Sequence, residues 1–294
     1  MVMRKITSLI SLLVVLARVT SAQVSVSIVF EQGQFLPGEE ILAAVKIANR
    51  SGQTLHLGAE SNWLTFFVEA KDGYVVEKLD DVPVVMPFDL ESSKVATKRV
   101  NLQPHFRLGK PGRYLVRATV RIKDWDREVA SPPQGFDLIG GARLWEQEFG
   151  VPRTNGVPEV RKYVLQQANY LRQVRLYARV TDADGTKFFG VVPLGPMVSF
   201  GRPDGQVDKH CNLHVLFQTG ARTFHYCMVT PEGVVQLRQN YGVTTNRPGL
   251  AMDDRGDVAV TGGARLQSSN DVPPAPSAEL TDEAAPTNAP PPNP

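Results

Sequence analysis

The sequence predicts an all-β protein of two domains, and three observations lead to this prediction. Short segments rich in Val, Thr, Phe and Tyr alternate between apolar and polar residues, as in Val24–Phe30. Turn residues separate these segments, since 22 prolines and 24 glycines are spread over 294 residues. A pattern of short strands also returns after ~40–50 residues in the C-terminal half, as in repeated β-architectures. The length suits two domains of ordinary size.

The first 22 residues have the three parts of a secretory signal peptide. Arg4 and Lys5 form a basic start, residues 6–16 form an apolar run, and residues 20–22 are small. We expect cleavage after Ala22. The apolar run is too short for a confident transmembrane anchor, and no second apolar segment of membrane length follows it. The sequence therefore predicts a secreted or periplasmic protein without a membrane span after cleavage.

The net charge excludes one class of partner. The chain carries +2 at pH 7, and removal of Arg4, Lys5 and Arg18 with the signal peptide leaves −1. A nucleic-acid-binding protein usually carries a clear basic excess. We therefore expect no nucleic-acid partner.

Residues 23–150 are expected to form the first domain, a β-sandwich. Turn chemistry recurs at the spacing of short strands, most clearly at Lys71-Asp72-Gly73, where Asp-Gly is a strong hairpin signal. The expected strands are 24–30, 41–47, 63–70, 74–79, 94–102 and 113–122.

Two short motifs add a resemblance to this pattern. Residues 36–39 read Leu-Pro-Gly-Glu and lead to a strand that ends in Ala-Asn-Arg-Ser-Gly at 48–52. Residues 106–108 and 111–116 read Phe-Arg-Leu and Pro-Gly-Arg-Tyr-Leu-Val. Both motifs resemble parts of bacterial immunoglobulin-like modules. The resemblance implies an immunoglobulin-like sandwich that serves as a spacer or binding platform, although a fold alone does not fix a function.

Residues 151–158, which read Val-Pro-Arg-Thr-Asn-Gly-Val-Pro, are expected to be a linker. Residues 159–265 are expected to form the second domain. Residues 161–170 fit either an amphipathic helix or a strand, and residues 174–180 alternate like a strand.

The strand pattern of the second domain repeats with a turn motif. Met252-Asp253 and the following strand return 45 positions after Val207-Asp208 and its strand. Residues 253–257 resemble β-propeller repeats with the pattern Asp-x-x-Gly-Asn/Asp, whereas Cys211 stands in the position of Gly256. We count about two blade-like repeats, while a closed propeller needs ~4–8. The domain is therefore either a small open sheet assembly or a part completed by a second copy.

The hairpin at 207–227 holds both cysteines of the chain. A three-residue loop at 218–220, with Gly220 left-handed, places Cys211 directly across from Cys227. In an exported protein this arrangement predicts a disulfide between Cys211 and Cys227. One alternative is a pair of free thiols. The other is a metal site of Cys211, His225 and Cys227, which lacks a fourth ligand because His210 and His214 fall on the opposite face.

Other motifs have simpler explanations as turns or loops. Residues 255–257 read Arg-Gly-Asp but align with the turn before a strand, and Asn49-Arg50-Ser51 is a glycosylation sequon only in a eukaryotic protein. No catalytic motif, dinucleotide fingerprint or phosphate-binding loop is found in the sequence, so no catalytic residue and no cofactor are expected.

The composition changes after Arg265. Residues 266–294 contain many prolines among Ala, Ser, Thr and Asn, with acidic residues and no base after 266. Such a segment has too few apolar groups to offset the entropy of ordering. We expect residues 266–294 to be a disordered tail that buries nothing.

Together these features predict a non-enzymatic binding or assembly module of the cell envelope or extracellular space. Its expected partner is a protein or a glycan, and the blade-like domain is a candidate for self-association. The first alternative is a carbohydrate-active enzyme fragment of glycoside hydrolase or sialidase type, because propeller blades also build such sites. The second is a protease-inhibitor-like module that uses the segment 83–91.

Overall fold

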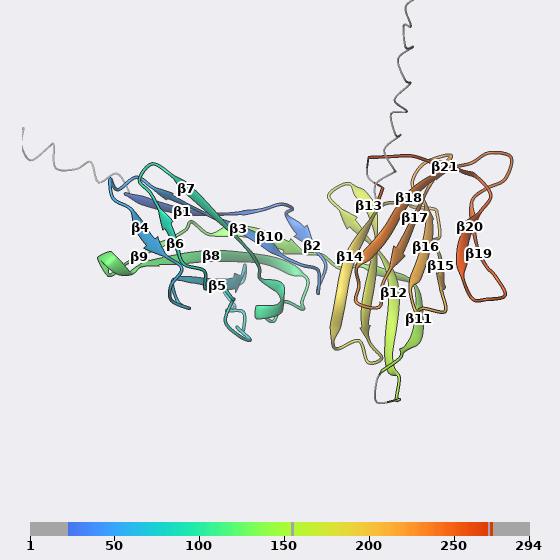
Figure 1. Ribbon diagram of the computed structural model, residues 1–294, viewed down its shortest axis with the longest axis horizontal. Coiled ribbons are helices and arrows are strands. Elements are labelled where there is room, and N and C mark those ends of the chain that lie inside the picture. The colour runs from blue at the N-terminus through green and yellow to red at the C-terminus, as the bar shows by residue number, and fades with distance from the viewer. Residues whose placement is uncertain (1–22, 154–155, 270, 273–294) are drawn as a thin grey trace, which may run out of the picture. The chain divides into compact units, whose positions relative to one another are not determined.

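The computed structural model describes residues 23–153, 156–269 and 271–272. The expected signal peptide, residues 1–22, lies outside the described residues. Apart from short 3₁₀ turns, the regular secondary structure in these ranges consists of strands (Figure 1), so the all-β prediction is confirmed. None of the helical turns in the described ranges is long and apolar enough to cross a membrane. The chain divides into two compact units, one of residues up to Phe200 with Pro231–Val234, the other of the remaining residues from Gly201 onward.

Two sheets of the first unit enclose one hydrophobic core, which contains apolar side chains of both. The first sheet has the order β1 (Val24–Phe30), β3 (Leu42–Asn49), β7 (Val95–Asn101). The second has the order β2 (Gln34–Phe35), β10 (Gln134–Leu138), β8 (Gly112–Ile122), β5 (Leu64–Ala70), with β9 (Arg127–Ala130) also paired to β8 (Figure 1). A short ribbon pairs β4 (Leu55–Leu57) with β6 (Phe88–Leu90).

Strand alternation decides which side chains enter this core. In β1, Val24, Val26 and Ile28 are buried while the residues between them are exposed. Aromatic rings extend the core toward the start of β8, where the Tyr114 ring stacks on that of Phe136 with 5.5 Å between ring centroids. This packing fixes Tyr114 beside the pocket described below. The expected strands of the first domain are therefore largely present, and residues 74–79 form only isolated bridges.

The first unit also contains a four-stranded antiparallel sheet in sequence order. Its strands are β11 (Ala142–Val151), β12 (Glu159–Tyr170), β13 (Gln173–Asp182) and β14 (Phe188–Pro196). The segment 161–170, which the sequence left open between helix and strand, is a strand, because β12 pairs with β11 on one side and with β13 on the other.

The segment 151–158 connects two paired strands instead of two domains. Val151 pairs with Glu159 at the closed end of the β11–β12 hairpin. Proline and glycine are as suitable for a hairpin connection as for a linker, which explains the different expectation. The first strand of this sheet therefore begins at Ala142, inside the range expected for the sandwich.

The second unit contains a five-stranded sheet and a separate hairpin. The sheet has the order β15 (Asp204–Val207), β16 (Leu213–Gln218), β17 (Thr223–Val229), β18 (Val235–Gly242), β21 (Ala264–Leu266). The hairpin pairs β19 (Gly249–Met252) with β20 (Val258–Thr261). Leu250 and Val260 of this hairpin pack on Leu216 and Phe224 of the sheet, so the unit has an apolar core of its own.

Residues beyond Arg265 take part in the second unit, contrary to the expectation that the tail begins at 266. Leu266 pairs with Asn240 in the sheet. The backbone N–H of Val272 donates to the carbonyl oxygen of Arg238 at 2.9 Å, and the Asp271 side chain is fully buried. The low apolar content of this segment did not predict its docking, because one carboxylate and a few backbone groups are enough to hold a short polar segment. The expected disorder of residues 273–294 lies outside the described residues.

Candidate functional site

The hairpin of β16 and β17 has a different register from the predicted one. Val215 pairs with Cys227, and Gln218 pairs with Phe224. The connection is therefore longer than the predicted three-residue loop, and the Thr219 N–H closes it by donating to the Thr223 oxygen at 3.0 Å. The prediction that Cys211 lies across from Cys227 is wrong.

The two cysteines are not joined by a disulfide. Cys227 is completely buried in β17, and this burial raises the pKa of its thiol to about 11. Cys211 lies in the turn before β16, outside the strand that carries His225 and Cys227. In the described part of the chain, no three His, Cys, Asp or Glu side chains are grouped so that they could hold a metal ion. The structure therefore does not bring Cys211, His225 and Cys227 together as a metal centre.

The repeated turn motif has the same geometry in both copies. The N–H of Asp208 donates to the oxygen of Asn212 at 2.9 Å, and the N–H of Asp253 donates to the oxygen of Asp257 at 2.9 Å. The φ angle is 66° at Cys211 and 79° at Gly256, a left-handed conformation that favours glycine. The alignment of Cys211 with a glycine position therefore identified the one cysteine with unusual backbone geometry.

A buried polar cluster lies behind the first of these turns. His214 Nδ1 is 2.6 Å from the Tyr226 hydroxyl, and His214 Nε2 is 3.0 Å from Asp208 Oδ2. Burial acts to raise the pKa of Asp208, but hydrogen bonds from His214 and Asn212 outweigh it and hold that pKa below its usual value. Burial raises the pKa of Tyr226 to about 12. Since the side chains of Asp208 and His214 are almost inaccessible, this cluster supports the turn.

Two of the remaining sequence motifs are occupied by structural contacts. Asn49 of the possible sequon is completely buried, and its Nδ2 donates to the oxygens of Gln53 at 2.7 Å and Leu90 at 2.8 Å. Asp257 of the Arg-Gly-Asp sequence is 2.7 Å from the Lys209 ammonium group. The contacts of Asn49 and Asp257 therefore explain both motifs as parts of turns.

The segment 83–91 is held against the core of the sandwich. The indole N–H of Trp63 donates to the Val84 oxygen at 2.9 Å, and the Val84 side chain is buried. Val85 and Met86 are exposed.

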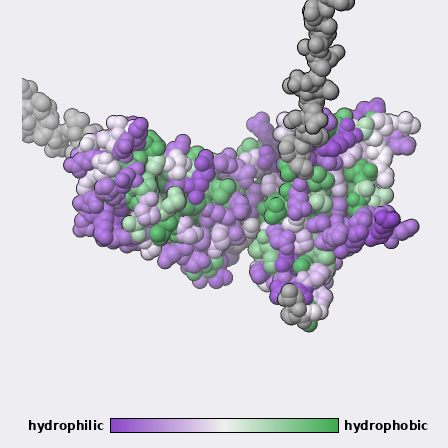
Figure 2. Space-filling view, in the orientation of Figure 1, coloured by the Kyte–Doolittle hydropathy of each residue, from purple (hydrophilic) through white to green (hydrophobic). Residues whose placement is uncertain are grey.

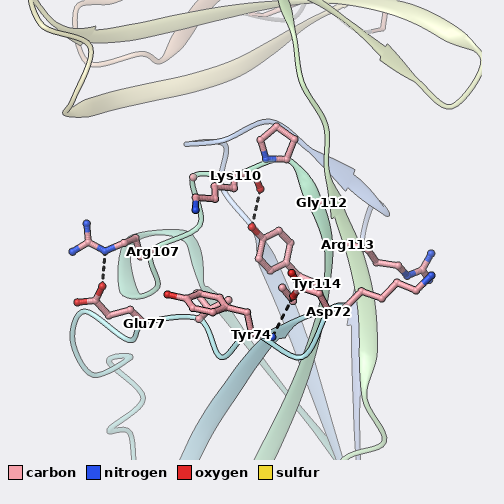
Figure 3. A pocket seen from close by; sticks show the side chains of 13 residues that line it. Asp72, Tyr74, Glu77, Arg107, Lys110, Gly112, Arg113 and Tyr114 are labelled. Carbon is pink, nitrogen blue, oxygen red and sulfur yellow. Dashed lines mark hydrogen bonds and ion pairs between the residues drawn. The ribbon is translucent and has the colours of Figure 1, made fainter.

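An open pocket of about 710 Å³ lies at one end of the sandwich (Figure 3). Its lining comes from residues 70–77, which begin at the end of β5, and from residues 107–114, which end in the first residues of β8. The Asp72-Gly73 turn shapes the first of these segments as predicted, since Gly73 has a φ of 84° and its N–H donates to the Ala70 oxygen at 2.9 Å. Antiparallel pairing of β5 with β8 brings the two segments together. A volume of this size fits a small ligand or a few residues of a polymer.

Two tyrosines lie in this pocket (Figure 3). Tyr114 is buried, and its hydroxyl donates to the Lys110 carbonyl oxygen at 2.7 Å. The Tyr74 residue is 66% exposed, so its ring is available to a ligand. In Figure 2 hydrophilic residues cover most of the visible face, with hydrophobic residues in scattered patches.

The charged residues of the pocket fall into two groups. Glu77 accepts a hydrogen bond from Arg107 Nε at 2.6 Å, and Arg113, which points away from the tyrosines in Figure 3, is 3.9 Å from Asp137 outside the pocket. In contrast, neither Lys71 nor Lys110 takes part in an ion pair within the described ranges. The pocket therefore offers two positive charges to a ligand.

The two carboxylates of the pocket have structural partners. Asp72 Oδ1 accepts a hydrogen bond from the N–H of Tyr74 at 3.2 Å and thereby supports the turn. Glu77 is engaged by Arg107. Both carboxylates of the pocket are therefore occupied by contacts within the chain.

Sequence reasoning did not identify this pocket as a site. Its turn residues were recognised, but Tyr74 and Tyr114 are 40 positions apart and no motif connects them. The available signal was the presence of bases in both segments, Lys71 in one and three bases within residues 107–113 in the other.

Comparisons with known proteins supply no function. No protein-family model matches the chain, and no curated protein gives a significant match. A function is therefore inferred below from the residues of this chain and their geometry.

Proposed function

We propose that the protein is an exported, non-catalytic binding module of the cell envelope or extracellular space, and that its pocket binds an anionic glycan. Export is inferred from the signal-peptide pattern of residues 1–22. The single observation that carries the ligand class is the exposed Tyr74 ring in one pocket with Lys71 and Lys110, which form no ion pair with any described residue.

The chemistry of these groups favours a sugar polymer with carboxylates. A tyrosine ring presents a flat apolar face with a polar tip, which suits the C–H face of a sugar ring. Lysine side chains at the rim attract carboxylates without requiring one fixed geometry, because the ammonium group is a compact charge on a flexible stem. The engaged state of Asp72 and Glu77 supports binding over glycoside hydrolysis, since hydrolysis needs one carboxyl group that is free to donate a proton.

Calorimetric titration of the mature chain tests this proposal. The probes are short oligomers of galacturonic acid, their neutral methyl esters, and an oligo-glutamate peptide of similar charge. We expect the acidic sugar to bind more tightly than the other two, with an affinity that falls as salt is added. We expect Tyr74→Ala to weaken binding roughly tenfold, corresponding to about 1.4 kcal/mol.

Two charge variants separate the role of the pocket from the charge of the whole protein. We expect the double variant Lys71→Gln/Lys110→Gln to remove the preference for the acidic sugar over its ester. Lys94→Gln/Arg127→Gln removes two exposed bases outside the pocket and is the matched control. Equal binding of acid and ester by the unmodified chain would refute the charge argument, and stronger binding of the peptide would identify a protein ligand instead.

A further inference from the structure

One face of the β11–β14 sheet carries several polar side chains among apolar ones, although it is partly buried. The register of β12 and β13 places Lys162 beside Thr181, Val164 beside Arg179, and Gln166 beside Tyr177. Paired residues in antiparallel strands point to the same face, so Gln166 and Arg179 are diagonal neighbours on it. Diagonal neighbours are close enough for long side chains to contact one ligand group.

An open cleft of about 680 Å³ lies within the first unit, and most of its lining belongs to this sheet and its connections. Both Gln166 and Arg179 line the cleft. Gln166 is only 5% exposed, and its Nε2 has no hydrogen-bond acceptor in the described part of the chain. A buried amide N–H group without an acceptor is destabilising, because it has lost its hydrogen bonds to water. The fold therefore keeps a donor in the cleft that its own side chains do not satisfy.

Arg179 is a second donor of the same kind. Its Nε is buried and has no acceptor in the described ranges, and its guanidinium group lies 5.0 Å from the centre of the Phe188 ring. Burial lowers the pKa of Arg179. The guanidinium group remains charged, because an arginine does not lose its proton in a protein.

The other cations of the cleft are already engaged. Lys162 donates to the Ala183 oxygen at 2.7 Å and is 3.3 Å from Glu148. Arg143 is 2.7 Å from Glu146. Arg179 is therefore the cation of this cleft without a carboxylate partner among the described residues.

We propose that Arg179 and Gln166 form a binding site for a single carboxylate group of a ligand. A guanidinium fork presents N–H groups to two oxygens of a carboxylate, and the Gln166 amide supplies a further donor from the adjacent strand. Glu146 and Asp184 also line the cleft, and their negative charges disfavour a phosphate or another multiply charged anion. The preferred group is thus a monoanionic carboxylate, which either a uronic acid or a peptide C-terminus provides.

The test uses pairs of probes that differ only in charge. D-Glucuronate is compared with D-glucuronamide, and acetyl-alanyl-alanine with its C-terminal amide. Binding is followed by ¹H–¹⁵N NMR of the side-chain N–H groups of Gln166 and Arg179 in the unmodified chain. We expect at least one carboxylate to shift both signals in a saturable way and its neutral partner to leave them unchanged. If D-glucuronate binds more tightly than acetyl-alanyl-alanine, the carboxylate comes from a sugar; the reverse order indicates a peptide C-terminus.

Variants assign the effect to the two donors. We expect Arg179→Gln to weaken carboxylate binding about tenfold or more, in line with the loss of a charge-assisted hydrogen bond. Arg143→Gln, which removes an exposed and paired cation of the same cleft, should leave binding within about twofold. Equal binding of charged and neutral probes, or no saturable shift in the unmodified chain, would overturn the proposal without reliance on any variant. Neither donor lines the tyrosine pocket, so Tyr74→Ala should leave these shifts unchanged and the two sites can fail separately.

Discussion

Docking of the segment 266–272 gives a prediction that separates the observed tail boundary from the one expected from composition. The perturbation is a chain that ends at Arg265, compared with a chain that ends at Val272, so that residues beyond 272 are absent from both. The shorter chain loses the two backbone hydrogen bonds between Val272 and Arg238 and the contact of the buried Asp271 carboxylate with Arg265 Nη2 at 3.3 Å. Its unfolding temperature should therefore be lower.

The magnitude follows from these contacts. Two backbone hydrogen bonds contribute about 1 kcal/mol each, and a hydrogen bond to a charged group contributes about 1.5–3 kcal/mol. Release of the segment from order offsets part of this sum, so we expect a net loss of about 2 kcal/mol. In a protein of this size such a loss lowers the midpoint by about 4–8 °C.

Differential scanning calorimetry of the two chains measures this difference. Asp271→Asn in the longer chain is the local control, because it keeps the backbone hydrogen bonds and removes only the charge. It should lower the midpoint by less than the truncation does. Identical midpoints of the two truncated chains would refute the docking of residues 266–272 and restore a tail that begins at 266.

Three further predictions concern the cysteines, the buried aspartate and a close backbone contact. Denaturation without reductant should allow alkylation of both Cys211 and Cys227. Cysteines that mass spectrometry finds alkylated only after reduction by a dithiol would contradict this. Asp208→Asn should destabilise the protein at pH 7. Because the folded pKa of this group is lowered from 3.8, its stabilisation is present above that value and is lost as the pH falls through the folded pKa. In urea titrations the difference between variant and parent should therefore shrink below about pH 4, and a difference that grows in acid would refute the assignment. Gly58→Ala should cost several-fold more stability than Gly52→Ala, which we expect to cost about 1 kcal/mol. Both glycines have a φ near +85°, but only at Gly58 would the new Cβ lie 2.0 Å from a carbonyl oxygen. If calorimetry finds similar losses of stability in the two variants, the φ angle alone sets the cost and the close contact at Gly58 does not add to it.

Alternation and turn chemistry were enough to predict where strands lie and which side chains share a face. They could not predict which residues pair across two strands. Val215, His225 and Cys227 lie on one face of the β16–β17 hairpin as predicted, although Cys227 pairs with Val215 instead of Cys211. An offset of an even number of residues keeps every side chain on its face, so the hydrophobic pattern cannot detect it. Loop length decides the register, and more than one loop length fits the polar residues at 218–222.

The candidate sites depend on distant parts of the chain, which explains why they were not predicted. Tyr74 and Lys110 share a pocket only because β5 and β8 are adjacent in the sheet. Gln166 and Arg179 are neighbours only if 161–170 is a strand, and the sequence left this segment open between helix and strand. By contrast, the left-handed conformation of Cys211 was predictable, because it is a local property that the repeated turn reveals.

The parallel pair of β2 and β10 has a consequence for the order of folding. It joins residues 34–35 to residues 137–138, so more than 100 residues must be in place before this contact forms. The β11–β14 sheet and the sheet from β15 to β18 pair in sequence order and need only short loops to close. Local pairings form faster than distant ones, because the entropy of loop closure grows with separation. The C-terminal meanders should therefore form before the N-terminal sandwich is complete. The β2–β10 pairing should form slowly and late.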